Sequence, residues 1–370
     1  MIRPDPVNLD RIAAMLTWPR GPVDSPVPKP GSPAMALILA ADLGGTKSSL
    51  RLHDTEGGAR RVLAQDTLAS GRFPDAVSVL AAFLRGAKVD AAAVAIAGPV
   101  VDGRSETPNL PWIVEREGLA QALGTGRVEL LNDLAATALG IAELDASRLA
   151  TLNEGRDRGG TIAVIAAGTG LGEAALVADG ERRIAMPSEG GHADFGPGDE
   201  TEVALLGFLS KRHGHVSWER VVSGPGLCAI HEFLVQSGRG EASAALAARM
   251  AAGDPAAAIA EAALAGDDPA AGAALDMFVR LYGAEAGNLA LKVLATGGVY
   301  LAGGIAPKIL PRLRSGPFLE GFLGKGRHAG LLAAMPVQVI LDPGAALLGA
   351  ARRAEALLGD ESAGAGTNRR

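Results

Sequence analysis

The chain has 370 residues, more than one hydrophobic core usually organises, so we expect two domains with a cleft between them. A formal net charge of −6 gives no broad basic surface, so neither nucleic acid nor a membrane is expected as a partner. The single cysteine, Cys228, excludes an internal disulfide and a multi-thiolate zinc site. No stretch approaches the roughly 20 apolar residues of a membrane span, and the start lacks a signal-peptide pattern, so we predict a cytoplasmic protein.

Prolines recur through residues 1–34, from Pro4 to Pro33, and they interrupt any long helix or strand. We therefore predict a disordered extension before the first folded element. The folded part of the chain is expected to begin near residue 36.

The first folded element is predicted to be a hairpin whose strands cover residues 37–41 and 48–52. The end of its first strand and its turn carry groups suited to a nucleotide: Asp42, Gly44, Gly45, Thr46 and Lys47. Glycines allow backbone N–H groups to approach a phosphate, and a carboxylate at a strand end suits Mg²⁺ held through water. Taken alone, the stretch also fits an ordinary glycine hairpin with a surface lysine.

The next hundred residues read as alternating strands and helices. The pattern predicts a strand from residue 62, a helix over 73–85, a strand over 91–97, a helix over 114–123, a strand over 128–131 and a helix over 134–142. A loop over 106–112 is kept rigid by two prolines and carries Asn109. Asn132 and Asp133 follow a buried strand, at the end where open α/β sheets place their ligands.

The opening pattern then recurs. An apolar strand over 160–167 leads into a turn containing Gly168, Thr169 and Gly170, and a second strand over 173–177 follows. Two copies of one plan indicate a duplicated domain, with each half presenting a glycine turn to a shared cleft. The duplication favours a nucleotide phosphate as the ligand of both turns.

The second half of the chain carries further polar residues on loops. A Gly/Pro-rich loop over 183–198 holds Glu189 and His192, and Glu219 lies before a long alanine-rich helical region over 227–295. Gly303 and Gly304 close a strand over 299–302. The remaining predictions are helices over 200–212, 318–323 and 344–358, a strand over 337–341 and a loose tail over 359–370. Each residue taken alone also has a structural interpretation: Glu219 fits a solvated residue at a helix start, and His192 fits a histidine packed in a loop.

Seven segments in this order resemble the bacterial glucokinases of the hexokinase, actin and Hsp70-type ATPase superfamily, near the repressor/kinase sugar kinases. They are residues 42–47, 107–112, 131–133, 167–172, 189–192, 219–226 and 302–305. Relatives with a zinc loop carry several cysteines after the segment matching 189–192, so this chain is similar to the zinc-free members. The resemblance implies a two-lobed actin-like, ribonuclease H-like α/β fold with duplicated mixed sheets and a helical insertion in the larger lobe. We place the lobes at 36–134 and 135–358, with the final helix able to pack on the small lobe.

The resemblance also implies what each segment binds. ATP would be held by Asp42, Gly44, Gly45, Thr46, Lys47, Gly168, Thr169, Gly170, Gly303 and Gly304, with Mg²⁺ arriving on the nucleotide and reaching Asp42 through water. The sugar would be held by Asn109, Asn132, Asp133, Glu189, His192 and Glu219. The implied reaction is ATP-dependent phosphorylation of D-glucose by a homodimer. Alternatives are a kinase for mannose, fructose or an amino sugar, a non-catalytic sugar-binding regulator, and a structural actin-like ATPase.

The implied general base is Asp133. A sugar alcohol is too weakly acidic to lose its proton unaided, and a positioned carboxylate contributes about 10²–10⁴-fold to such a transfer. A rigid place between a buried strand and a helix suits that task. The structural alternative is that Asn132 or Asp133 caps the helix that follows.

Overall fold

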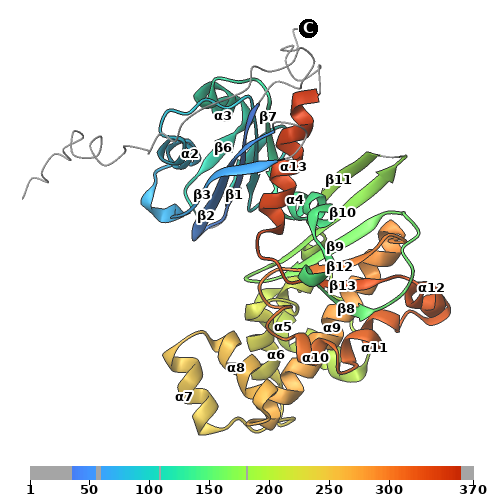
Figure 1. Ribbon diagram of the computed structural model, residues 1–370. Coiled ribbons are helices and arrows are strands. Elements are labelled where there is room, and N and C mark those ends of the chain that lie inside the picture. The colour runs from blue at the N-terminus through green and yellow to red at the C-terminus, as the bar shows by residue number, and fades with distance from the viewer. Residues whose placement is uncertain (1–35, 56–59, 108–109, 181, 360–370) are drawn as a thin grey trace, which may run out of the picture.

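The computed structural model describes residues 36–55, 60–107, 110–180 and 182–359 (Figure 1). The predicted extension over 1–34, the tail beyond residue 359 and the candidate residue Asn109 lie outside the described residues. Two β-sheets dominate the described part of the chain, and most of the helices gather against the second sheet (Figure 1).

The first sheet has the strand order β3-β2-β1-β4-β7. Its strands are β1 (Leu37–Leu43), β2 (Lys47–Asp54), β3 (Arg61–Ala69), β4 (Ala91–Ile96) and β7 (Val128–Asn132). β1, β2 and β3 form an antiparallel meander, whereas β4 and β7 continue the sheet parallel to β1. Apolar side chains of one face pack with α2 (Ala76–Leu84) and α3 (Arg116–Leu123). A short hairpin of β5 (Arg104–Glu106) and β6 (Ile113–Glu115) precedes α3.

The second sheet repeats this order as β11-β10-β9-β12-β13, with one extra strand, β8, on its edge. Its strands are β8 (Leu149–Asn153), β9 (Ile162–Ala167), β10 (Leu171–Asp179), β11 (Arg182–Ser188), β12 (Gly298–Ala302) and β13 (Val337–Ile340). β9, β10 and β11 are again an antiparallel meander, and β12 and β13 are parallel to β9. The repeated topology confirms the predicted duplicated mixed-sheet fold.

The structure corrects the loop predicted over 183–198. Its first part forms β11, which pairs with β10 from Arg182 to Ser188. β11 is the edge strand of its sheet, where the missing N–H of Pro187 need not break a ladder. The short 3₁₀ turns η5 (Gly190–His192) and η6 (Trp218–Arg220) flank α5 (Glu200–His213) and position the polar residues of this region.

The helical part lies between β11 and β13 in the sequence and packs largely on the second sheet. Its helices are α5 (Glu200–His213), α6 (Gly224–Gln236), α7 (Ala244–Ala252), α8 (Pro255–Ala265), α9 (Pro269–Val293), α10 (Leu310–Leu313), α11 (Pro317–Leu323) and α12 (Ala329–Ala333). α8 and α9 both start at a proline after an aspartate cap, and these starts divide the helical region predicted over 227–295. α9 spans the sheet and holds the largest core cluster together.

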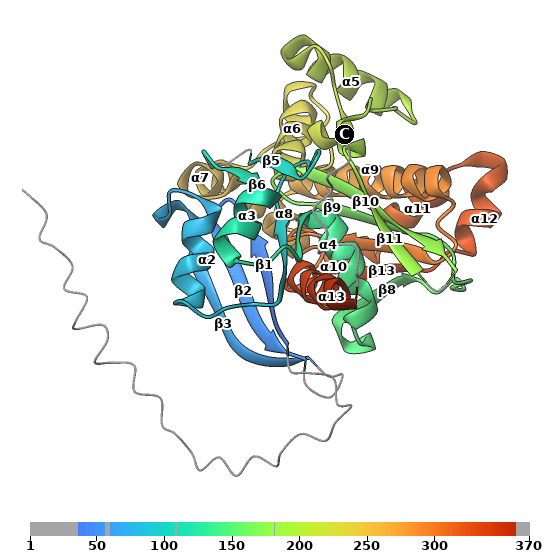
Figure 2. The same ribbon diagram turned by 90° about the horizontal axis from the view of Figure 1, so that it is seen from above.

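Two helices, α4 (Asp133–Gly140) and α13 (Ala345–Gly359), join the sheets. Figure 2 shows α13 beside α4, between the two sheets. α13 also packs on β1 and β4 of the first sheet. The helices approach at backbone distance, because a Cβ on Gly349 would lie 1.8 Å from the carbonyl oxygen of Ala136, and one on Gly140 would lie 2.0 Å from that of Ala345. Glycine at both positions is therefore required for this crossing.

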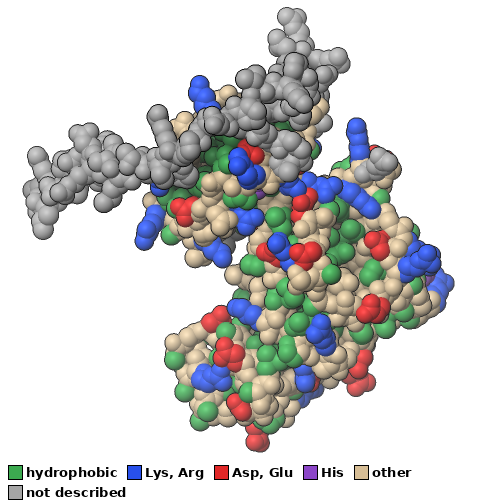
Figure 3. Space-filling model, in the orientation of Figure 1, with side chains coloured by type: hydrophobic (Ala, Val, Ile, Leu, Met, Phe, Trp, Pro, Cys, Tyr) green, Lys and Arg blue, Asp and Glu red, His purple; other side chains and the backbone are tan. Residues whose placement is uncertain are grey.

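Within the described ranges, no helix is long and apolar enough to cross a membrane. On the face drawn in Figure 3, acidic and basic side chains are interspersed.

The α4–α13 contact yields a stability prediction. Gly349→Ala places a methyl group against the Ala136 carbonyl, so we expect a loss of about 1–3 kcal/mol in the free energy of unfolding. Gly207→Ala is the matched control, because Gly207 lies exposed within α5 and a Cβ there meets nothing within 4 Å. The control should gain about 0.5–1 kcal/mol from reduced backbone entropy. Urea unfolding measures both, and equal stability of the two variants would contradict the close crossing.

Candidate functional site

The candidate site is a cavity of about 770 Å³ lined by both sheets. It lies where the parallel strands end: Asn132 is the last residue of β7, Gly168 follows β9, Gly303 follows β12 and Leu341 follows β13. The carboxyl ends of parallel strands are where open α/β sheets place ligands.

The cavity brings together most of the predicted site residues. These are Asp42, Lys47, Asn132, Asp133, Gly168, Thr169, Gly170, Glu189, His192, Glu219, Gly303 and Gly304. Three predicted residues, Gly44, Gly45 and Thr46, are not among its lining residues.

Those three residues form a tip that is tied to its own strand. The Gly44 N–H donates to the Lys47 carbonyl at 3.0 Å, and the Ser70 hydroxyl donates to the Gly44 carbonyl at 2.7 Å. Asp42 and Lys47, on either side of the tip, do line the cavity. In the structure the first hairpin therefore contributes a carboxylate and a cation to the cavity.

The turn after β9 is fixed from two sides. The Gly168 carbonyl accepts the Gly224 N–H at 2.8 Å, at the start of α6. From η6, the Glu219 carboxylate accepts the Leu171 N–H at 3.0 Å. A Cβ on Gly170 would lie 2.5 Å from that carboxylate, so glycine is needed for its close approach. The turn is thus held in place before any ligand binds.

Asn132 and Asp133 divide the two roles that the sequence left open. Asn132 is the N-cap of α4: its side-chain oxygen accepts the N–H groups of Leu134 and Ala135 at 2.9 and 3.2 Å. Its amide group donates to the Gly98 carbonyl at 3.0 Å, which fixes the side chain. Asp133 Oδ1 accepts the Leu134 N–H at 2.9 Å, and its other oxygen has no hydrogen-bond partner among the described residues. Asp133 is therefore the one with an oxygen free for a ligand.

Burial changes the acidity of two of the carboxylates that line the cavity, Asp42 and Asp133. Desolvation raises the pKa of Asp42 to about 6, and the nearby Lys47 ammonium opposes that rise. Desolvation also raises the pKa of Asp133 to about 6, and the negative charges of Asp42 and Glu189 add to the effect. A carboxylate that still ionises below neutral pH, yet has a raised proton affinity, is suited to accept a proton.

Glu189, His192 and Glu219 form an arc on another wall of the cavity. His192 Nε2 lies 3.8 Å from a Glu189 oxygen, and His192 Nδ1 lies 3.9 Å from a Glu219 oxygen. The side chains of His192 and Glu189 are more than half exposed, so both can reach a ligand. Such a set of acceptors and one imidazole can pair with the adjacent hydroxyls of a sugar.

Sequence reasoning missed several lining residues. Lys308 lies in the loop after Gly303 and Gly304, and Glu173 lies on β10. The sequence did offer a signal for Lys308, because Lys47 also follows a glycine pair. The sequence offered no signal for Glu173. This residue is buried, and the residues near it in the sequence do not indicate that other parts of the chain cover it.

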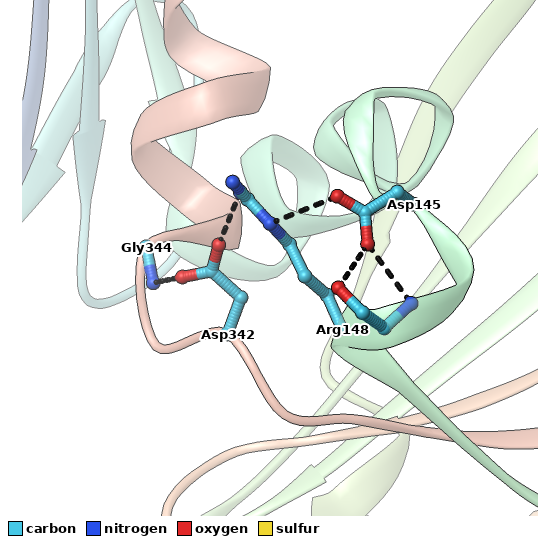
Figure 4. A network of polar contacts seen from close by, with 5 residues as sticks. Asp145, Arg148, Asp342 and Gly344 are labelled. Carbon is cyan, nitrogen blue, oxygen red and sulfur yellow. Dashed lines mark hydrogen bonds and ion pairs between the residues drawn. The ribbon is translucent and has the colours of Figure 1, made fainter.

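The loop that closes the cavity beside α13 is anchored by a polar network (Figure 4). Arg148 Nη1 donates to Asp342 at 2.7 Å, and the other Asp342 oxygen accepts the Gly344 N–H at 2.7 Å. Arg148 also lies 3.5 Å from Asp145. Asp342 itself lines the cavity. The network fixes the start of α13 against the second sheet.

Comparison with known proteins places this geometry in a family. The sequence model of the glucokinase family matches residues 39–357. The chain belongs to the glucokinase family. It is 44% identical over 336 residues to a curated glucokinase of Nostoc sp., covering 86% of this chain and 98% of that protein. Members of the family therefore share nearly the whole described length of this chain.

Solved structures agree with the assignment. A glucokinase from an Antarctic psychrotroph is 30% identical and superposes with a TM-score of 0.75, over 87% of this chain and 99% of its own. A ROK family glucokinase from Streptomyces griseus, in complex with glucose and AMPPNP, shares the fold at 24% identity, with a TM-score of 0.57 over 86% of this chain and 99% of its own. The glucokinase fold thus extends over both sheets of this protein.

The raised pKa of Asp133 predicts that replacing its carboxyl group increases the stability of the fold, by an amount that depends on pH. The fold favours the neutral acid, so this group lowers the free energy of unfolding as pH rises from about 4 to about 6 and adds no further change above. Asp133→Asn should therefore be more stable than wild type by up to about 3 kcal/mol at pH 7, and by little at pH 4. Thermal unfolding at both pH values measures the difference. A difference that does not change with pH would contradict the raised pKa.

Proposed function

We propose that the protein transfers the γ-phosphoryl group of ATP to the 6-hydroxyl of D-glucose, with Asp133 as the general base. The observation that carries the proposal is the single cavity shared by Asp133, the Gly168–Gly170 turn and the arc of Glu189, His192 and Glu219. Phosphoryl transfer needs positioning and charge neutralisation more than covalent help from the protein. A cavity with a phosphate side and a hydroxyl side meets that need.

The nucleotide is proposed to lie along the glycine turns. Backbone N–H groups of the Gly168–Gly170 turn would face the phosphates, and the loop at Gly303 and Gly304 would face the adenosine. Lys47, at the start of β2, and Lys308, in the loop after β12, add positive charge to the cavity lining. The tip at Gly44–Thr46 would reach the phosphates only when the two sheets close over the nucleotide, a motion that also excludes water as a competing acceptor.

Mg²⁺ is proposed to arrive with ATP rather than in a preformed protein site. Within the described residues, no group of three or more His, Cys, Asp and Glu side chains is arranged to hold a metal ion. Asp42 fits a water-mediated contact, because it lines the cavity and its carboxylate accepts no hydrogen bond from the described residues. When bound, Mg²⁺ would neutralise charge on the β- and γ-phosphates.

Asp133 would act on the acceptor hydroxyl. With a pKa of about 6, Asp133 is ionised at neutral pH. Its free carboxylate oxygen can accept the proton of the sugar hydroxyl as the hydroxyl oxygen attacks phosphorus. Its other oxygen stays on the Leu134 N–H, which fixes the carboxylate against α4. Asn132 would support this geometry as the cap of the same helix.

Glu189, His192 and Glu219 are proposed as sugar ligands, together with Asn109. The lobes are proposed at 36–134 and 135–358. A cytoplasmic location and a homodimer are proposed from the resemblance to the family alone. D-Glucose is the proposed substrate because relatives at 42–44% identity carry the name glucokinase.

The test is turnover of purified protein with ATP and Mg²⁺ on a panel of D-glucose, D-mannose, D-fructose and an amino sugar, measured by coupled ADP release. Glucose should give the highest kcat/KM. Asp133→Asn should still bind glucose, and it should lose about 10²–10⁴-fold in kcat because only the base is removed. Asp66→Asn, at an exposed position on β3, is the matched control and should keep wild-type turnover.

Two results would contradict the proposal. Preference for another hexose would overturn the substrate, and wild-type turnover by Asp133→Asn would remove this residue from the role of base.

A further inference from the structure

A further buried carboxylate, that of Glu173, lies under the turn that carries Glu189 and His192. Glu173 is on β10 and is 1% exposed. It pairs with Ser188 of β11 and with Ile165 of β9 across the sheet. One of its oxygens is buried and has no hydrogen-bond partner among the described residues. No step of the proposed reaction uses this residue.

Glu173 points away from α4 and toward η5. The adjacent Gly172 faces α4, because a Cβ there would lie 2.7 Å from Leu134, and side chains alternate along a strand. On the other face, a Cβ on Gly190 would lie 2.0 Å from a Glu173 carboxylate oxygen. The Gly190 N–H donates to the Ser188 hydroxyl at 3.0 Å, which holds the turn close. The carboxyl group of Glu173 is therefore in contact with the turn between Glu189 and His192.

Behind Glu173, α9 presents another carboxylate, that of Glu285, in a polar group that also contains Lys292 and Lys325. Glu285 is fully buried and accepts hydrogen bonds from Asn288 at 2.7 Å and Lys292 at 3.3 Å. Lys325 donates to Asn288 at 2.7 Å from the loop after α11. Glu285 thus has its own cation, and no cation forms an ion pair with Glu173 within the described ranges.

The surroundings favour the neutral form of Glu173. Desolvation raises its pKa to about 8, the negative charge of Glu285 adds to the rise and the Lys292 ammonium opposes it. On the turn side, the charged and titratable groups facing this region are Glu189, His192 and Glu219. The raised pKa favours the protonated carboxyl, which can donate as well as accept a hydrogen bond.

We propose that Glu173 is a positioning residue of the sugar subsite: as a neutral carboxyl it fills the space beneath Gly190 and fixes the turn that carries two of the proposed sugar ligands. This rests on the proposed function. When Glu173 ionises, two negative charges lie together in the protein interior, and the turn must move to admit water. Sugar affinity should therefore fall at alkaline pH, while ATP affinity and kcat at saturating sugar change little.

The test compares variants of Glu173 across pH 6.5–9.5. In wild type, KM for glucose should rise about tenfold between pH 7 and 9, as one ionisation near pH 8 requires. Glu173→Ala should raise KM for glucose at pH 7, and Glu173→Gln should restore most of that loss. In Glu173→Gln the alkaline rise should be absent, because glutamine does not ionise. KM for ATP serves as the internal reference.

Glu285→Gln removes the negative charge beside Glu173 and keeps a side chain of similar shape. Removing the negative neighbour makes Glu173 easier to ionise, so the rise in KM for glucose should begin at lower pH than in wild type. Ile165→Ala, a buried neutral position that pairs with Glu173 across the sheet, is the matched control. It should lower the melting temperature and leave the pH dependence of KM as in wild type.

A readout without substrate keeps this proposal distinct from the proposed function. The fold favours neutral Glu173, so wild type should lose stability from about pH 5 to about pH 8, and Glu173→Gln should gain in Tm relative to it over that range. A Tm difference that grows with pH supports the neutral carboxyl even if glucose proves not to be the substrate. An alkaline KM profile shared by wild type and Glu173→Gln, or a Tm difference independent of pH, would overturn the proposal.

Discussion

The contact between α4 and α13 is the constraint on which the rest of the structure depends. Gly140 and Gly349 bring the backbones of these helices together, and any side chain at either position would separate them. α4 begins with the proposed base, and α13 begins beside the loop of Asp342 that lines the cavity. The same contact therefore sets the distance between the two sheets and the position of the residues that face each other across the cavity.

The polar interior of the cavity is arranged at a cost in stability. Burial opposes the negative charge of Asp42 and of Asp133. It also opposes the charge of Glu173, which lies beside the carboxylate of Glu285. Buried carboxylates of this kind are destabilising unless a ligand or a proton neutralises them. Binding of a magnesium nucleotide and a sugar would supply partners for Asp42 and Asp133. For Glu173 beside Glu285, a retained proton removes one of the two charges. In adjacent parts of one cavity, the proposed reaction therefore uses the ionised form of Asp133, whereas the proposed sugar subsite uses the protonated form of Glu173.

The sequence predicted the fold well where the local pattern is strong. Both glycine hairpins and the buried strands follow from periodicity and turn chemistry, and the repeated hairpin predicted the duplication. β11 was missed because Pro187 and the following glycines read as a loop, and only its edge position explains the strand. The sequence also placed Gly44, Gly45 and Thr46 with the site, while in the structure this tip lies outside the cavity lining. Distances across a cleft are set by tertiary packing, which one local motif does not encode.

The pH dependence of kcat/KM for glucose is the most direct test of the central claim, that Asp133 accepts the sugar proton in a site shared with Asp42. In wild type, kcat/KM should fall below about pH 6, where Asp133 is protonated. In Asp42→Asn the midpoint of this fall should move to lower pH, because a negative neighbour that raises the pKa of Asp133 has been removed. A midpoint that stays in place, or full activity of wild type well below pH 5, would contradict the account.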